Sequence, residues 1–377
     1  MITKYHTETD YDVIIAGGGL AGLSAGILLS RKFSVLLIDP DKYPRHKMCG
    51  EYLSAEVELL LKELGIDINN ATEMHFDNLL FSTSRGKTIE AKLPLGGYGI
   101  SRYQLDFDLY QIYIQKADFE LDKVLDVNNE SDYFEVKTKT KSYTCKQFIM
   151  ATGKRSILDK SLSRDFVQNK SPWLAIKRHY KFDMPTNQVQ LHNFNGGYAG
   201  LSKVENGDVN LCYLATFDSF KEYKDIDRFN ENVVARNPFL EEFFAKAEPQ
   251  WEQPISISQI SFEEKKPVEN DIIMIGDTAG LIHPLCGNGM AMAIDSAVIA
   301  ARCIDPFLHN SASKQTCLKN YDSEWKKTFK SRLRMGRYLQ NIFLNQRLTK
   351  FSLGLLKTVP AALPLIIRKT HGSKISV

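Results

Sequence analysis

The chain has 377 residues, of which 43% are apolar and 25% charged, and its formal net charge is +3 at pH 7. This composition allows a full hydrophobic core and the length suggests two domains, while the absence of internal repeats and low-complexity tracts excludes a repeat array. The six cysteines show no C-x-x-C spacing, which leaves a metal site unsupported, and no signal peptide precedes the first predicted strand, so free thiols in the cytoplasm are expected.

A glycine-rich turn near the N-terminus predicts a dinucleotide site. The apolar, β-branched run Val13–Ala16 is typical of a buried parallel strand. It is followed by Gly17, Gly19 and Gly22 in the pattern G-x-G-x-x-G. The first glycine allows a tight turn, the second lets the backbone approach a pyrophosphate, and the third lets the next helix pack closely on the sheet.

The elements after this turn complete a βαβ unit. Leu20–Arg31 has the small and apolar residues of a helix packed on a sheet, and its N-terminus offers free N–H groups to phosphates. Ser34–Ile38 is the second predicted strand. Asp39 at its end can accept hydrogen bonds from ribose hydroxyls, although a plain turn residue before Pro40 is the alternative.

The middle of the chain predicts a different kind of sheet. Asn187–His192 and Gly207–Leu214 alternate in the manner of strands, and Arg228–Ala247 is predicted to be helical. We therefore expect a mostly antiparallel α+β substrate domain in this region.

A second glycine-rich segment indicates which dinucleotide is bound. Ile272–Ile275 is another buried-strand pattern and ends in Gly276 and Asp277. An aspartate at this strand edge can hydrogen-bond the ribityl hydroxyls of a flavin, a chain that NAD lacks; a helix N-cap is the alternative for Asp277. The next helix, predicted over Met290–Ile304, would direct its N-terminal dipole at an anionic reduced flavin. We expect further cofactor-site residues in the loop before this helix and at its first position: Gly287, Asn288, Gly289 and Met290.

The C-terminal part of the chain is strongly basic. From Trp325 to Val377 there are twelve Lys and Arg residues and no Asp or Glu. The apolar run Phe351–Ile367 is too short and too interrupted to span a bilayer. We expect either a segment that docks on an anionic membrane surface or a helical subdomain with a solvated basic face, and the two are compatible. Nucleic acid binding is not expected, because no aromatic–basic platform is present.

These segments resemble the geranylgeranyl reductase family, within the flavoproteins that share the aromatic hydroxylase fold. The resemblance is carried by five segments: Gly17–Gly22 with Asp39, Lys47-Met-Cys49-Gly50, Arg102–Asp106, Ala151-Thr152-Gly153 with Arg155-Ser156, and Gly276–Met290. It implies bound FAD, and it adds Lys47, Arg102, Asp106 and Gly153 to the expected cofactor-binding residues.

The order of these segments predicts the fold class and the domains. We expect an α/β protein with a Rossmann-like FAD-binding domain, interleaved with the mostly antiparallel α+β substrate domain and followed by a helical C-terminal segment. The FAD-binding domain would take residues 1–75, 100–165 and 268–330, the substrate domain 76–99 and 166–267, and the basic helical segment 331–377.

Two departures from related flavoproteins bear on the reaction. Thr152 stands where the hydroxylases usually have aspartate, which weakens the hydroxylase interpretation. The tryptophans, Trp173, Trp251 and Trp325, do not form the Trp-x-Trp-x-Ile-Pro segment of the flavin halogenases, so a halogenase is not expected.

Three residues are candidates for direct action on a substrate. The resemblance places Cys49 at the flavin ring, where it is either a proton donor or a small packing residue. His283, beside the expected flavin, could handle a proton, or it could be a solvent-facing loop residue. Tyr198 matches the first aromatic residue of a strand that lines an isoprenoid channel in the family, although Gly200 and Ser202 replace the aromatic residues that follow.

The predicted function is an FAD-dependent oxidoreductase, and two reactions compete. In the first, reduced flavin delivers hydride to a carbon–carbon double bond of a prenyl or polyene lipid-like substrate. The alternative is a flavin monooxygenase, a hydroxylase or epoxidase that uses NAD(P)H and oxygen on an aromatic or alkene substrate. The expected electron donor is NAD(P)H or an external reduced carrier, such as an electron-donor protein. The expected location is the cytoplasm, with peripheral contact to the inner face of the membrane.

Overall fold

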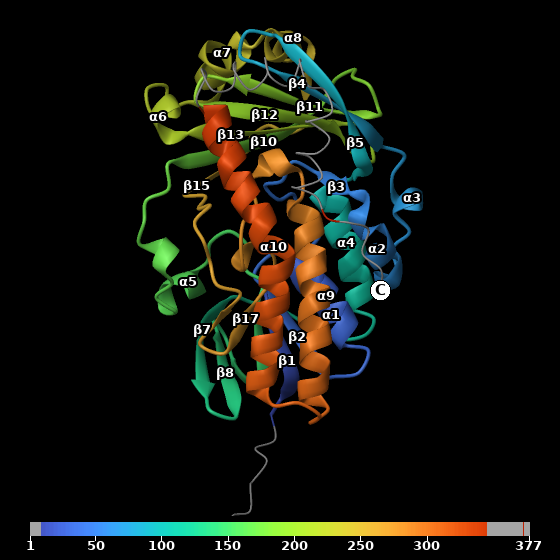
Figure 1. Ribbon diagram of the computed structural model, residues 1–377, viewed down its shortest axis with the longest axis vertical. Helices are drawn as coiled ribbons and strands as arrows, with labels where there is room; N and C mark the ends of the chain where they lie inside the picture. Colours follow the sequence, from blue (N-terminus) through green and yellow to red (C-terminus); the bar gives the residue numbers. More distant parts are fainter. Residues whose placement is uncertain (1–8, 345–371, 373–377) are drawn as a thin grey trace, which may run out of the picture.

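The computed structural model describes residues 9–344 and Gly372, and it contains two β-sheets with helices between and around them (Figure 1). The first sheet has the strand order β16-β17-β9-β1-β2-β6, with the hairpin β7–β8 attached to β9. The strands of this sheet are β1 (Tyr11–Ala16), β2 (Val35–Asp39), β6 (Asp118–Leu121), β7 (Val124–Glu130), β8 (Tyr133–Thr138), β9 (Ser142–Met150), β16 (Val268–Glu269) and β17 (Ile272–Met274).

The centre of the first sheet is parallel and fully buried. Strand β1 pairs in parallel with β2 and with β9, and Val13, Ile14 and Ile15 have no exposed surface. Such a sheet needs helices on both faces, which explains the continuous apolar runs of its strands. Its helices include α1 (Leu20–Leu29), α4 (Arg102–Tyr113) and α9 (Gly289–Leu308), and α1 packs against both of the others.

The second sheet is mostly antiparallel and has the strand order β14-β10-β13-β12-β11-β4-β5-β3, with β15 also paired to β10. Only the β4–β11 pair is parallel among its described pairings. Its strands are β3 (Tyr52–Ser54), β4 (His75–Ser82), β5 (Thr88–Gly99), β10 (Trp173–Lys181), β11 (Gln188–Phe194), β12 (Gly197–Lys203), β13 (Val209–Thr216), β14 (Glu248–Pro249) and β15 (Ile255–Ser258).

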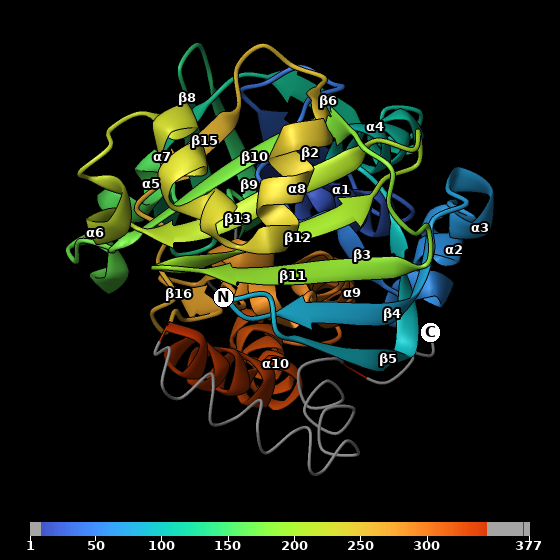
Figure 2. The same ribbon diagram turned by 90° about the horizontal axis from the view of Figure 1, so that it is seen from above.

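The two faces of the second sheet belong to different apolar clusters. On β13, Leu211 and Ala215 pack into the cluster under α7 (Ile226–Asn232) and α8 (Pro238–Lys246), whereas Cys212 and Leu214 belong to the cluster on the opposite face. This alternation follows from the period of two of a strand. Figures 1 and 2 show α7 and α8 over the outer face of the sheet, with the first sheet and its helices on the inner side.

Short helices complete the description: α2 (Glu58–Leu64), α3 (Ile68–Ala71), α5 (Ile157–Ser161) and α6 (Phe217–Phe220). The predicted helix Arg228–Ala247 is divided in two, because Asn237 caps a new helix that begins at Pro238. The signal for this break was in the sequence, where an N-cap residue is followed by proline.

The long helix α10 (Lys314–Leu344) packs against α9 and extends toward the second sheet (Figure 1). The predicted apolar run Phe351–Ile367 and most of the basic segment after Leu344 lie outside the described residues. Within the described part of the chain, no helix is both long and apolar enough to cross a bilayer. The two sheets, their connecting order and the C-terminal helices confirm the predicted fold class.

Candidate functional site

A cavity of about 720 Å³ lies between the two sheets. At one end it is bordered by predicted cofactor residues from the first sheet and its loops: Gly19, Arg102, Gly153, Gly276, Asp277, Gly287, Asn288, Gly289 and Met290. At the other end it is walled by the inner face of the second sheet and by α10. The structure therefore brings most of the predicted cofactor site together with a second, mostly apolar compartment.

The apolar compartment crosses six adjacent strands of the second sheet. Its lining includes Ala175 of β10, Leu214 of β13, Tyr198 of β12, Leu191 of β11, Phe81 of β4 and Ile89 of β5. At a strand spacing of roughly 4.8 Å, this width corresponds to about 24 Å. Met335, Tyr338, Leu339 and Ile342 of α10 also line it. The extent across the sheet and the lining suit a long apolar ligand.

The pyrophosphate end of the site combines a helix N-terminus with two cations. Gly19 is the N-cap of α1 and makes no side-chain cap hydrogen bond. A Cβ atom at Gly19 would lie 3.4 Å from Nη2 of Arg102 and 3.5 Å from Nζ of Lys47. Free N–H groups, a positive dipole end and two cationic side chains form a donor set suited to an anionic diphosphate.

Asp106 holds both cations in place. Its carboxylate accepts two hydrogen bonds from Arg102, at 2.6 and 2.7 Å, and lies 3.4 Å from Nζ of Lys47. Burial lowers the pKa of Lys47 to about 8, although Asp106 opposes this shift. Asp106 is fully buried and does not line the cavity, so it orients the two side chains that do face the glycine turn.

The other two motif glycines are packing positions. A Cβ atom at Gly22 would lie 1.9 Å from the carbonyl oxygen of Gly17, and one at Gly17 would lie 2.4 Å from that of Ala151. Gly17 also has φ +106°, a backbone conformation that favours glycine. These contacts fix the close approach of α1 to the strand ends.

Asp39 braces the glycine turn from the end of β2. Its Oδ2 accepts a hydrogen bond from the Gly18 N–H at 2.6 Å, and its Oδ1 lies 2.7 Å from Nη2 of Arg45. Tyr43 donates a hydrogen bond to the Gly18 carbonyl oxygen. The role of Asp39 toward ribose stays a prediction. The sequence around Asp39 did not indicate that Arg45 is its ion-pair partner.

At the opposite end of the predicted cofactor site, Asp277 lies between a strand end and the N-terminus of α9. Its Oδ2 is 3.2 Å from Nζ of Lys154, and both residues line the cavity. The adjacent Thr278 hydroxyl accepts a hydrogen bond from the Gly153 N–H at 2.9 Å. The first N–H groups of a helix have no partner within the helix, and Gly289 and Met290, at the start of α9, line the cavity.

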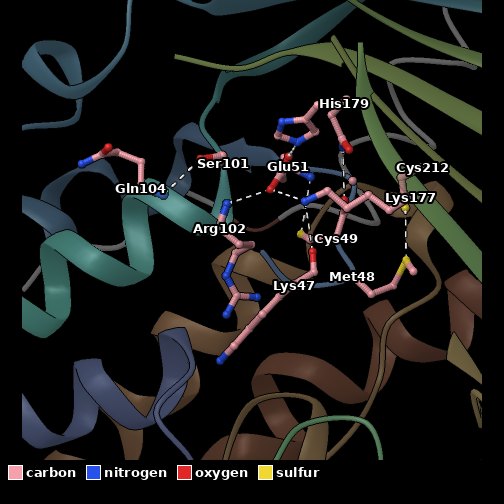
Figure 3. Close-up of polar contacts among 12 residues, drawn as sticks. Lys47, Met48, Cys49, Glu51, Ser101, Arg102, Gln104, Lys177, His179 and Cys212 are labelled. Carbon is pink, nitrogen blue, oxygen red and sulfur yellow. Dashed lines mark hydrogen bonds and ion pairs between the residues drawn. The ribbon is translucent and has the colours of Figure 1, made fainter. Parts of the chain in front are cut away.

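Cys49 lines the cavity where the predicted cofactor site meets the apolar compartment. Figure 3 shows it beside Lys47, Glu51 and Lys177. Its Sγ accepts a hydrogen bond from the Glu51 N–H at 3.4 Å, and the side chain is half-buried. The structure describes all six cysteines as free thiols. Cys49 therefore has the position that a proton donor to a cavity ligand requires.

His283 occupies a different position from the one expected. It is 2% exposed, lies behind the cavity wall, and packs against Trp173, Tyr198 and Phe262. Burial lowers the pKa of His283 to about 3, so its imidazole is neutral at pH 7. Tyr198, by contrast, lines the cavity. A catalytic role for His283 stays a prediction, and the contact through which it could act is Tyr198.

A buried ionic cluster beside Cys49 was not predicted. Both carboxylate oxygens of Glu51 are bound, one by Nζ of Lys177 and the other by Nε2 of His179 at 2.6 Å (Figure 3). Burial alone would raise the pKa of Glu51, but Lys177 and His179 outweigh it and lower the pKa to about 2. His46 lies close enough to complete a group of possible metal ligands, but the ammonium of Lys177 disfavours a second cation at this carboxylate.

The family of the chain follows from comparison with known proteins. A family model described as an FAD binding domain matches residues 10–334. The chain belongs to this family. Two reductases are similar to it over most of their length. Menaquinone reductase of Mycobacterium tuberculosis (strain ATCC 25618 / H37Rv) is 25% identical over 321 residues, 78% of this chain and 76% of that protein. Digeranylgeranylglycerophospholipid reductase of Methanocaldococcus jannaschii is 24% identical over 336 residues, which cover 84% of this chain and 82% of that protein.

Solved structures of FAD-binding family folds agree with the architecture. The flavin-dependent brominase Bmp2 superposes with a TM-score of 0.77 at 19% identity, covering 96% of this chain and 93% of that one. PqsL of Pseudomonas aeruginosa, a probable FAD-dependent monooxygenase, superposes with a TM-score of 0.72 at 15% identity, covering 90% of this chain and 98% of that one. The prediction of an FAD-dependent oxidoreductase is confirmed at this level, and these structural likenesses concern the fold alone.

The residues present fit FAD. The N-terminus of α1 with Arg102 and Lys47 provides a diphosphate cradle, and Asp277 with the N-terminus of α9 provides acceptors and donors for the flavin end. The two ends border one cavity, as a single extended cofactor requires.

Proposed function

We propose that the protein reduces carbon–carbon double bonds in a prenyl or polyene lipid-like substrate. The observation that carries this proposal is the apolar compartment that crosses six strands and reaches Cys49 and the flavin end of the site. An aromatic ring would fill only part of such a compartment. Similarity to the proteins named menaquinone reductase and digeranylgeranylglycerophospholipid reductase supports the same choice.

Each part of the site has a task in this reaction. Arg102, Lys47 and Asp277 would hold FAD, which in its reduced form would supply the hydride. The sheet and α10 exclude water and align the chain of the substrate along the compartment. Cys49 holds a proton at Sγ; it transfers this proton to one carbon of the double bond while the other carbon accepts the hydride, and its thiolate regains a proton from solvent. NAD(P)H or a reduced carrier protein restores the electrons.

Anaerobic reoxidation tests the reaction. The purified flavoprotein is reduced with dithionite without oxygen and mixed with prenyl and polyene lipids. We expect reoxidation together with a product that is two hydrogen atoms heavier per double bond. Cys49→Ala should slow this step at least tenfold and leave the flavin spectrum intact, whereas Cys303→Ala, in the core of α9, should not change it. A protein that reoxidises only with oxygen and yields an oxygenated product would be a monooxygenase instead.

We also propose that the open end of the apolar compartment faces an anionic membrane. Lys327, Lys330 and Arg334 are exposed on α10 and share one helix face with Tyr338, which is 62% exposed and also lines the cavity. Basic residues around an aromatic side chain are typical of surfaces that contact anionic lipid. A lipid substrate could then enter from the bilayer directly.

Liposome binding tests this surface. Binding to anionic vesicles should weaken steeply with salt, because the Debye length falls from about 10 Å at 0.1 M to about 3 Å at 1 M. Replacing Lys327, Lys330 and Arg334 by glutamine should weaken binding more than the same change at three lysines of the α6–α8 side: Lys221, Lys224 and Lys246. Equal binding by the two triple variants would rule out α10 as the contact.

A further inference from the structure

The backbone of the Cys49 loop, residues 47–51, is held almost entirely by groups from other elements. All five carbonyl oxygens of this loop accept a hydrogen bond, and four of the donors are side chains. The bonds are Lys177 Nζ to Lys47 O at 3.0 Å, Lys154 Nζ to Met48 O at 3.2 Å, Asn210 Nδ2 to Cys49 O at 3.1 Å, Ser202 Oγ to Gly50 O at 2.9 Å, and Ile100 N to Glu51 O at 3.4 Å. Three of these donors lie on the inner face of the second sheet.

Glu51 is the residue at which these restraints converge. Its carboxylate contacts Lys177 and His179 on β10, and it accepts a hydrogen bond from the Arg102 N–H at 2.8 Å, at the start of α4 (Figure 3). One side chain thus joins the Cys49 loop, the substrate-facing sheet and the helix that carries the diphosphate-binding arginine. The side chain is fully buried.

The backbone of Glu51 needs this anchor. Its φ is +55°, in the left-handed region that side-chain-bearing residues rarely adopt. Such a conformation persists where the surrounding structure imposes it. The N–H of Glu51, oriented by this conformation, donates to Sγ of Cys49. Releasing the carboxylate would let the backbone relax, and this would remove the donor and move the thiol.

We propose that Glu51 is a positioning residue for Cys49, and that Lys177 is the partner through which the substrate-facing sheet sets the place of the thiol in the cavity. The pair makes the distance between Cys49 and a substrate on the sheet independent of movements elsewhere in the first domain. This proposal rests on the proposed function for its turnover prediction, but not for its prediction on the thiol itself.

The variants are chosen to separate position from stability. Glu51→Gln keeps the shape but loses the charge, and Glu51→Gln with Lys177→Met avoids leaving a buried lysine unpaired. Lys177→Arg keeps a positive charge next to Glu51 and should therefore retain part of the function. The matched control is Asp208→Asn, which breaks the Lys181–Asp208 pair on the same sheet, at 2.6 Å, away from the loop.

The first measurement is the rate at which iodoacetamide alkylates Cys49 in the folded holoprotein. Peptide mass spectrometry follows the modification over time. We expect at least a fivefold change in Glu51→Gln and in the double variant, a smaller change in Lys177→Arg, and none in Asp208→Asn. The second is turnover of the lipid substrate, where kcat should fall at least tenfold while KM stays within twofold. Flavin content per chain should remain that of the wild type, because Arg102 and Asp106 are intact.

Wild-type alkylation rates in both Glu51 variants would overturn the proposal, whatever the result of the turnover assay. If Glu51→Gln fails to fold, Ser202→Ala and Asn210→Ala each remove one loop bond, and each should change the alkylation rate at least twofold; wild-type rates in both would overturn it equally. A wild-type protein that reduces no lipid would contradict the proposed function alone, since the alkylation results stand without a substrate.

Discussion

Two glycines of the same motif should respond to alanine in opposite ways. A methyl group at Gly19 would meet only the ends of two flexible side chains, Arg102 and Lys47, at 3.4 and 3.5 Å. Gly19 has φ −89° and ψ −173°, which alanine adopts without strain. A methyl group at Gly22 would lie 1.9 Å from a backbone oxygen, where no real Cβ atom fits. Gly19→Ala should therefore affect the ligand and Gly22→Ala the fold.

The expected magnitudes follow from these contacts. The apoprotein of Gly19→Ala should match the wild type within about 0.5 kcal/mol, as surface substitutions usually do. Its FAD affinity should fall because a diphosphate oxygen can no longer approach the start of α1, and a lost charge-assisted hydrogen bond costs roughly 1.5–3 kcal/mol. That is about tenfold to a hundredfold in Kd. Gly22→Ala gains about 1 kcal/mol of helix propensity but loses roughly 1–3 kcal/mol or more by overpacking.

Both quantities can be measured on protein stripped of flavin. Fluorescence titration with FAD gives the Kd, and denaturant unfolding without FAD gives the stability of each apoprotein. The wild type titrated in parallel controls for the stripping step. A Kd for Gly19→Ala within twofold of the wild type would refute the assignment of this turn to the diphosphate, and an unchanged unfolding midpoint for Gly22→Ala would refute the packing argument.

Three further predictions concern the cofactor and the substrate. Asp277→Ala should weaken FAD retention by roughly 1.5–3 kcal/mol, the value of a hydrogen bond to a charged group, while Asp271→Asn should not; equal retention by the two variants in a dialysis assay would contradict the role of Asp277. Because the pKa of Lys47 is lowered to about 8 in the free protein and a bound diphosphate favours its ammonium form, FAD binding above pH 8 takes up a proton. The Kd should thus be constant below pH 7 and rise by up to about tenfold per pH unit above 8, and Lys47→Met should abolish this dependence. Gly200→Trp should block the apolar compartment next to Leu191, whose Cδ2 lies 3.5 Å from a Cβ atom at this position, so turnover of long prenyl chains should fall more than that of short ones; an equal loss for all chain lengths would contradict the proposed path.

The cofactor end of the site was predictable because its signals are local. Gly17, Gly19 and Gly22 lie within six residues of one another, and Asp277 follows the end of strand β17 by three residues, in the short 3-10 helix Gly276–Thr278. Each pattern follows from the geometry of a βα unit and needs no knowledge of distant residues. The fold class followed from the order of these segments along the chain.

The ionic cluster around Glu51 was not predictable in the same way. Glu51 and Lys177 are 126 residues apart, and their contact exists only because the second sheet packs over the Cys49 loop. One signal was present in the sequence: Lys177 and His179 follow directly on the apolar run Trp173–Ile176, which is typical of a buried strand. A cation in a buried strand needs a partner, although the sequence does not say which one. The burial of His283 was not predictable for the same reason, since it depends on contacts with Phe262 and Trp173, which are distant in sequence.

The alternation along the second sheet has a consequence for how this protein can diverge. Ala199 and Leu211 pack beneath the outer helices, while their neighbours Tyr198 and Cys212 face the cavity. Mutations at the inward-facing set can reshape the ligand compartment without changing the cluster beneath the outer helices, although Ser202 and Asn210 of this set also hold the Cys49 loop. A library randomised at the inward-facing residues of β12 and β13, with Ser202 and Asn210 kept, should therefore explore new specificities with few unfolded members.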